Sequence, residues 1–141
     1  MSYQPKLLNL EVPAYPGTRY QGSKNKIVDW IWEQIAFLDF RSVLDAFGGT
    51  GVVGYKYKGQ EKEVTYNDLL KFNYYGGVAL IQNNETLVTD ADLKGILKRK
   101  NKQYGNIIQK HFTDVYFTDE ENEWLDYVVQ NIQEMENPYK K

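Results

Sequence analysis

The pattern of hydrophobic and polar positions predicts alternating helices and strands in the first half of the chain. Ser23 stands where an N-cap precedes an apolar periodic run, and Gly59 stands where a helix commonly ends. Gly76 and Gly77 weaken the last of these helices. The expected elements are a helix over residues 24–38, a strand over 41–45, a helix over 51–59, a strand over 62–68 and a helix over 69–84.

The second half is more polar and predicts helices only. We expect a short helix at about residues 90–99, followed by a loop. Residues 118–136 predict a strong final helix, because Thr118 and Glu121 have the spacing of a capping box. No further strand is indicated after residue 68.

Helix, strand, glycine loop, helix and strand in this order are typical of the opening of a Rossmann-type parallel sheet. A complete doubly wound sheet needs more strands than the pattern provides. The predicted fold is therefore α/β, with an incomplete Rossmann-like sheet, flanking helices and a helical C-terminal segment. We expect an N-terminal arm over residues 1–18, a Rossmann-like part over 19–82 and a helical segment over 83–141.

Composition narrows the possible chemistry. The chain of 141 residues has no cysteine, which excludes disulfides, thiolate nucleophiles and cysteine-ligated zinc. Its one histidine, His111, makes a histidine-rich metal site or a Ser-His-Asp triad improbable, and we expect it on the surface. The N-terminus does not resemble a signal peptide and no apolar run could span a bilayer, which predicts a cytoplasmic protein.

The stretch "VLDAFGGTGVVGY" carries the main functional signal. Gly49, Gly51 and Gly54 have G-x-G-x-x-G spacing between a predicted strand and a predicted helix. Asp68 ends the next strand, where a carboxylate accepts hydrogen bonds from a ribose in nucleotide-binding folds. Asp45 stands before the glycines and would repel a pyrophosphate.

S-adenosylmethionine suits such a loop better than a dinucleotide. Its sulfonium and ammonium groups are positive, so an acid beside the loop favours their binding. The pattern Asp-x-Phe-x-Gly-x-Gly over residues 45–51 therefore favours the methyl donor over a nicotinamide or flavin nucleotide. A nicotinamide-linked oxidoreductase fragment and a glycine turn without any ligand remain as alternatives.

Three segments together resemble the start of the Dam-type adenine-N6 DNA methyltransferases. They are "RYQGSKNKIVDWI", "DAFGGTGVVGYKYK" and "VTYNDL", in the order that the family has them. The resemblance covers about residues 18–82 and implies a class I fold that binds S-adenosylmethionine. It also implies a bacterial or phage enzyme of a restriction-modification system, with double-stranded DNA as its substrate.

The resemblance implies a set of donor-binding residues. Its first segment contacts the amino-acid end of the donor, and Lys24 there suits an ion pair with the donor's carboxylate. The alternatives without a ligand are that Lys24 is only solvated and that Tyr20 only packs against other side chains. The matching positions are Tyr20, Gly22, Ser23 and Lys24 in the first segment, Asp45, Phe47, Gly49 and Gly51 in the loop, and Asn67 and Asp68 after the second strand.

The family's catalytic motif, Asp-Pro-Pro-Tyr or a close variant, does not occur in this sequence. The string "NPYK" at residues 137–140 lacks one proline and follows a helix, so we interpret Pro138 as a helix terminator. No catalytic residue is therefore predicted. We expect a truncated enzyme that is inactive alone. The alternative is a non-catalytic subunit of a split enzyme, with a second chain carrying the motif; an open sheet edge would also allow a homodimer.

A local basic run in the second half is a candidate DNA contact. Net charge is −2, so any attraction to DNA must come from such a patch. A solvated basic face is the alternative. The residues of the candidate are Lys98, Arg99, Lys100, Lys102 and Tyr104, with Lys94 and Lys110 nearby.

Overall fold

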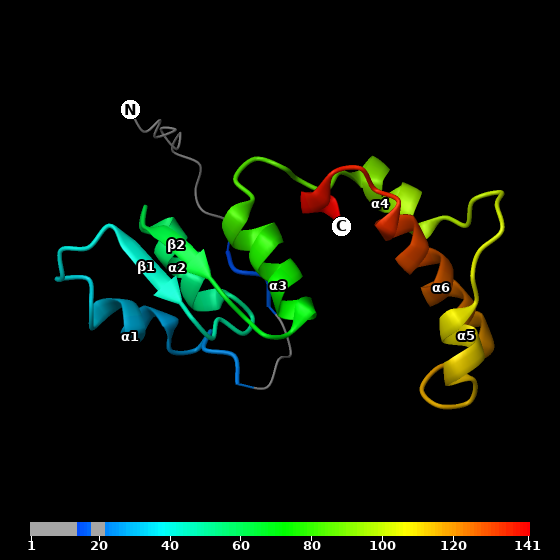
Figure 1. The fold of residues 1–141 in the computed structure, drawn as a ribbon, viewed down its shortest axis with the longest axis horizontal. Coiled ribbons are helices and arrows are strands. Elements are labelled where there is room, and N and C mark those ends of the chain that lie inside the picture. Colours follow the sequence, from blue (N-terminus) through cyan, green and yellow to red (C-terminus); the bar gives the residue numbers. More distant parts are fainter. Residues whose placement is uncertain (1–13, 18–21) are drawn as a thin grey trace. The chain divides into compact units, whose positions relative to one another are not determined.

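The computed structural model describes residues 14–17 and 22–141 (Figure 1). The chain divides into two compact units, Met1–Gln82 and Asn83–Lys141. The first contains α1 (Val28–Glu33), β1 (Ser42–Asp45), α2 (Val52–Gly59), β2 (Glu63–Tyr66), α3 (Lys71–Gly77) and η1 (Val78–Gln82). The second contains α4 (Asp90–Leu97), α5 (Ile107–Phe112), α6 (Asp119–Gln133) and η2 (Pro138–Lys140).

The first unit is built on a β1–α2–β2 crossover. The two strands are parallel neighbours, with Ser42 opposite Glu63 and Asp45 opposite Tyr66. Parallel strands need a crossover connection, and α2 provides it. In the part of the chain that the structure describes, the sheet has these two strands. The molecule is thus a mixed α/β structure with a small parallel sheet, and β1 ends at Asp45 as predicted.

One face of this sheet is packed and the other is exposed. Side chains alternate between half-buried and exposed along both strands. A methyl group on Gly54 of α2 would lie 3.3 Å from Val64 Cγ1, so α2 covers the half-buried face. Leu44, on the other face, is 62% exposed.

Helix α2 lies at the centre of the core of the first unit. Val52 and Tyr57 on this helix are buried, together with Val28 of α1 and Ile81 of η1. The ring of Trp32 contacts that of Tyr57, with 5.9 Å between the centroids. This apolar packing holds α1 against the crossover unit.

Helix α1 is shorter than predicted. It covers six residues, and its N-cap is Ile27 rather than Ser23. The Ser23 hydroxyl accepts a hydrogen bond from the Asn25 backbone amide at 3.4 Å, which is the two-residue spacing of a serine turn. Residues 34–38 form turns, in which Leu38 N–H donates to the Ile35 carbonyl. The predictions of a helix over 24–38 and of Ser23 as its cap are therefore wrong.

The end of the first unit follows the predicted weak point. Helix α2 ends at Gly59 as expected. Helix α3 ends at Gly77 and continues as the π-helix η1, so the predicted single helix is divided at its glycines.

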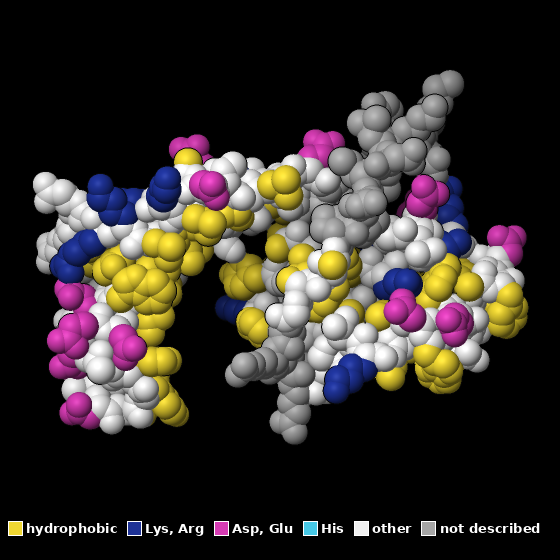
Figure 2. Space-filling model, turned by 180° about the vertical axis from the view of Figure 1, so that it is seen from behind, with side chains coloured by type: hydrophobic (Ala, Val, Ile, Leu, Met, Phe, Trp, Pro, Cys, Tyr) yellow, Lys and Arg dark blue, Asp and Glu magenta, His cyan; other side chains and the backbone are white. Residues whose placement is uncertain are grey.

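The second unit is organised by polar side chains of α6. Thr118 and Glu121 form the predicted capping box at its start. Both carboxylate oxygens of Asp126 accept 2.9 Å hydrogen bonds from the first amides of α5, which the sequence pattern did not predict. Figure 2 shows hydrophobic side chains gathered along one side of this unit. No helix in the described ranges is both long and apolar enough to cross a membrane.

Candidate functional site

The glycine loop follows β1 directly and turns the chain into α2. Gly49 and Gly51 have φ values of 55° and 79°, in the left-handed region that favours glycine. Gly51 N–H donates to the Gly48 carbonyl at 2.9 Å, and Gly51 is the N-cap of α2. The tight turn therefore depends on glycine at both positions.

Tyr66 supports this loop from β2. Its ring lies against Gly48 and Gly77, because a methyl group on either would come within 2.5 Å of a ring carbon. Its hydroxyl oxygen lies 2.5 Å from the Gly49 carbonyl oxygen and 3.2 Å from that of Asn73, so it links the loop to α3. Sequence reasoning missed Tyr66, although the small residues that accommodate its ring were visible.

Asp45 lies half-buried behind the loop. Its Oδ2 accepts a hydrogen bond from Gly54 N–H at 3.1 Å. Burial raises the pKa of Asp45; the Gly54 bond and the charge of Lys24 oppose this shift, and the charge of Asp68 adds to it. Lys24 and Asp68 are therefore both close enough to Asp45 to interact with it electrostatically.

Asp68 lies at the other side of the loop and is held by three donors. Gly49 N–H donates to Oδ2 at 2.8 Å. Leu70 N–H and the Asn73 side-chain amide both donate to Oδ1 at 2.9 Å. These bonds hold the pKa of Asp68 below its usual value, the Asn73 bond most. The carboxylate is thus fixed in its ionised form at the loop.

Asn67 joins the two strand ends. Its backbone N–H donates to the Asp45 carbonyl at 2.9 Å, and its side-chain amide donates to the Ala46 carbonyl at 2.8 Å. Its own carbonyl accepts from Gly48 N–H at 3.0 Å. Asn67 therefore supports the loop through its backbone and its side chain, and its predicted contact with a ligand stays a prediction.

Two apolar side chains stand exposed beside the carboxylates. Phe47, in the loop, is 86% exposed, and Leu69, directly after Asp68, is 95% exposed. These two side chains leave apolar area exposed beside the loop.

The first predicted segment is described only in part. Tyr20 lies outside the described residues. Gly22 has a φ of 85°, Ser23 is engaged in its turn, and Lys24 is exposed. Among the described residues of this segment, Lys24 lies close enough to Asp45 for its charge to lower the pKa of that carboxyl.

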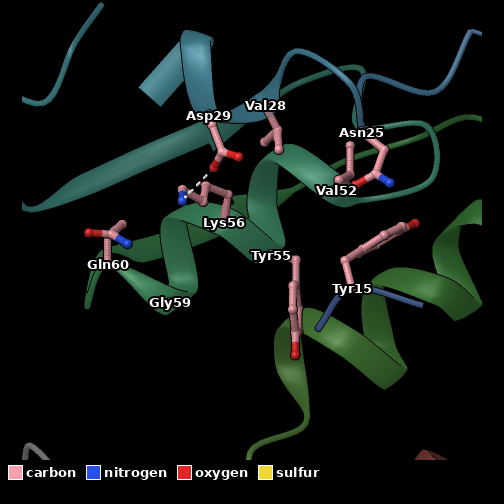
Figure 3. Close-up of a pocket in the computed structure, with 9 residues that line it drawn as sticks. All are labelled: Tyr15, Asn25, Val28, Asp29, Val52, Tyr55, Lys56, Gly59 and Gln60. Atoms are coloured by element: carbon pink, nitrogen blue, oxygen red, sulfur yellow. Dashed lines mark hydrogen bonds and ion pairs between the residues drawn. The ribbon is translucent and has the colours of Figure 1, made fainter. Parts of the chain in front are cut away.

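A separate pocket of about 350 Å³ lies between α1 and α2 (Figure 3). Asp29 and Lys56 form an ion pair of 2.7 Å at its wall, and the rings of Tyr15 and Tyr55 meet edge to face at 5.9 Å. Neither predicted carboxylate lines it. Tyr15 donates a hydrogen bond to the Thr50 carbonyl at 2.7 Å, so this pocket contacts the loop from the side of α1.

The basic run of the second unit is largely paired with acids of α6 and of its C-cap. Arg99 forms an ion pair with Glu123, and Lys100 and Lys102 form ion pairs with Glu134. The Tyr104 hydroxyl donates to Asn131 Oδ1 at 2.9 Å. Tyr104 is half-buried, with Lys102 Nζ 4.5 Å from its ring centroid.

Arg99, Lys100 and Lys102 thus each have an acidic partner within their own unit. Lys94, Lys98 and Lys110 are exposed. DNA contact by the run stays a prediction. His111 is exposed on α5, so the expected surface position is confirmed.

Comparisons with known proteins bear on the ligand of this site. The sequence model of the D12 class N6 adenine-specific DNA methyltransferases matches residues 20–138. The chain is 36% identical over 129 residues to the type II methyltransferase M2.HphI of Haemophilus parahaemolyticus, covering 92% of this chain and 38% of the relative. It is 30% identical over 128 residues to the type II methyltransferase M.NlaIII of Neisseria lactamica, covering 84% of this chain and 38% of the relative.

The chain thus spans well under half the length of these relatives. No solved structure matches it. The family match confirms the resemblance predicted from the three sequence segments and speaks against the nicotinamide alternative. The protein belongs to the D12 class N6 adenine-specific DNA methyltransferase family.

Proposed function

We propose that this chain is the donor-binding part of a DNA methyltransferase that transfers a methyl group from S-adenosylmethionine to N6 of adenine. The observation that carries the proposal is the meeting of Asp45, the glycine loop and Asp68 at the carboxyl ends of two parallel strands. Ligands of open α/β sheets bind at this end. We propose a class I methyltransferase fold for the same reason.

The residues present fit this methyl donor. Asp68 is an ionised acceptor beside the loop, suited to a ribose hydroxyl. Asp45 places negative charge beside the loop, which suits a sulfonium and an ammonium group and disfavours a phosphate. The exposed Phe47 and Leu69 offer apolar area to an adenine ring.

Each side chain then has a simple task. Asp68 binds and orients the ribose, Lys24 pairs with the amino-acid carboxylate, and Asp45 favours the positive end of the ligand. When bound, the donor supplies an electrophilic methyl group on its sulfonium. The chain contributes binding and alignment, which lower the barrier of a direct displacement.

We further propose that the Asp-Pro-Pro-aromatic motif is supplied by additional polypeptide, either as part of a longer chain or as a second chain. Three observations support this proposal: the motif is absent from these 141 residues, the relatives are longer, and Leu44 lies exposed on an uncovered sheet face. The helices that connect further parallel strands would cover that face. Double-stranded DNA as substrate and a homodimer through the sheet edge are part of this proposal.

Calorimetry on the 141-residue chain tests the proposed ligand. We expect binding of S-adenosylmethionine and none of NAD; the opposite result would overturn the proposal. Methyl transfer to DNA is expected only when a polypeptide with the missing motif is added. Transfer by the purified chain alone would contradict the proposed division of the enzyme.

A further inference from the structure

Asn73 is buried beside the predicted ribose acceptor. It lies in the first turn of α3 and is 3% exposed. Its side-chain amide donates to Asp68 Oδ1 at 2.9 Å. An ionised carboxylate only accepts hydrogen bonds, so the group that faces it must be the NH2 of Asn73. A buried amide directed at a functional carboxylate indicates more than packing.

The backbone of Asn73 is fixed by the residues that shape the loop. The Tyr66 hydroxyl lies 3.2 Å from the Asn73 carbonyl and 2.5 Å from the Gly49 carbonyl. The ring of Tyr66 is enclosed by glycines on two sides. Asn73 therefore keeps a fixed position relative to the glycine loop. Its side-chain amide in turn holds Asp68 in place relative to the loop.

Counting acceptor positions shows what the amide does to Asp68. An ionised carboxylate has about four lone-pair positions, two on each oxygen. Oδ1 accepts from Leu70 N–H and from Asn73, so both of its positions are filled. Oδ2 accepts from Gly49 N–H and keeps one open position. A ligand hydroxyl can therefore join Asp68 through Oδ2 without displacing any donor.

Resting on the proposed function, we propose that Asn73 is a positioning residue. Its amide occupies Oδ1 and holds the carboxylate of Asp68 so that Oδ2 is the oxygen that accepts a hydrogen bond from the donor's ribose. The same amide favours the ionised form of Asp68, because its hydrogen bond is the largest influence lowering that pKa. Without the amide, Oδ1 keeps only the hydrogen bond from Leu70 N–H, and the carboxylate is held less firmly in the orientation that binds the ribose.

The test combines a protein change with a ligand change. Asn73→Leu removes the amide while keeping the branching at Cγ, and Asn73→Asp keeps the shape while exchanging the donor for an acceptor. S-adenosylhomocysteine and its 2′,3′-dideoxyribose analogue are titrated into the full chain by calorimetry. Gln34→Leu, an exposed amide on the surface after α1, is the matched control. Thermal unfolding shows whether each variant is folded.

We expect both Asn73 variants to bind S-adenosylhomocysteine about tenfold more weakly than the wild type, because a carboxylate that the amide no longer holds accepts the ribose hydroxyl less well; a tenfold loss corresponds to about 1.4 kcal/mol. The dideoxy analogue should bind to the wild type and to the variants with the same affinity, because it lacks the hydroxyls from which Asp68 accepts hydrogen bonds. Equal losses for both ligands would show a merely structural role and overturn the inference, as would unchanged affinity in both variants. A wild-type chain that binds neither S-adenosylhomocysteine nor S-adenosylmethionine would instead refute the proposed function.

Discussion

The two neighbouring glycines at the end of α3 allow the packing around the loop to be measured. A methyl group on Gly77 would lie 2.5 Å from Tyr66 Cδ1, whereas nothing lies within 4 Å of a methyl group on Gly76. The opposite side of the ring already packs closely against Gly48, where an added methyl group would lie only 2.1 Å from Cε2. The ring therefore has little room to move away from Gly77. The same substitution to alanine therefore meets opposite environments one residue apart.

The expected free-energy changes follow from these contacts. Gly76→Ala should stabilise the first unit by about 0.5–1 kcal/mol through helix propensity and reduced unfolded-state entropy. Gly77→Ala has the same gain, but overpacking costs about 1–3 kcal/mol and a displaced Tyr66 loses a hydrogen bond of about 1 kcal/mol. The net result is a destabilisation of about 1–3 kcal/mol, so the two variants should differ by about 3 kcal/mol.

Urea unfolding measures this difference. A Trp124→Phe background leaves tryptophan fluorescence only in the first unit, where Trp30 and Trp32 lie. The midpoint should rise for Gly76→Ala and fall for Gly77→Ala, with unchanged slopes. Donor affinity should fall only for Gly77→Ala, because Tyr66 also holds the glycine loop. Equal stability of the two variants would refute the reasoning that Tyr66 is wedged between glycines.

Three other predictions concern charge. Burial raises the pKa of Asp45, so as pH falls this carboxyl takes up its proton earlier than an ordinary aspartate does, and donor affinity should fall with it. Asp45→Asn should remove this pH dependence. Calorimetry at several pH values measures both effects. Asp92 pairs with Lys140 at 2.7 Å and has a pKa of about 2, below its unfolded value of 3.8, so its contribution to stability should be present above about pH 4 and lost as pH falls through 2. NMR titration of Asp92 should show the pKa rising in Lys140→Met, and an unchanged pKa would mean that the pair is not formed in solution. If the basic run contacts phosphates, Glu134→Gln should free Lys102 and raise the affinity for double-stranded DNA several-fold at low salt; unchanged binding would count against the run as a DNA contact.

Features that depend on neighbours in sequence were predictable. Thr118 and Glu121 are three residues apart and form their capping box within one turn. The strand, glycine loop and helix from β1 to α2 follow the same logic, because Asp45, Gly51 and Gly59 each mark a local change in backbone conformation. This locality explains why the loop and its two acids could be located without a structure.

Features that depend on distant neighbours were not predictable. Helix α5 is six residues long, and its first amides are capped by Asp126 of α6 rather than by a residue of its own segment. The charges of Arg99 and Lys102 are compensated by Glu123 of α6 and by its C-cap Glu134, which the sequence alone cannot show. Ser23 looked like a cap, but its hydroxyl serves a turn instead.

The site itself shows the same division. Asp68 was predicted from its place after a strand, whereas Asn73 and Tyr66, which hold it and the loop, were not. Their roles arise from the packing of α3 against the strand ends, and a helix of this kind offers many polar and aromatic positions that never approach a site. Only the structure shows which of them do.

The most direct test of the central claim is to locate the bound donor on the chain. Backbone amide shifts of the labelled 141-residue protein would be followed by NMR during titration with S-adenosylmethionine. The amides of Gly49, Gly54 and Leu70 should shift most, because they donate hydrogen bonds to the two carboxylates. Shifts confined to Asn25, Lys56 and Gln60, which line the pocket between α1 and α2, would contradict a donor site at the strand ends.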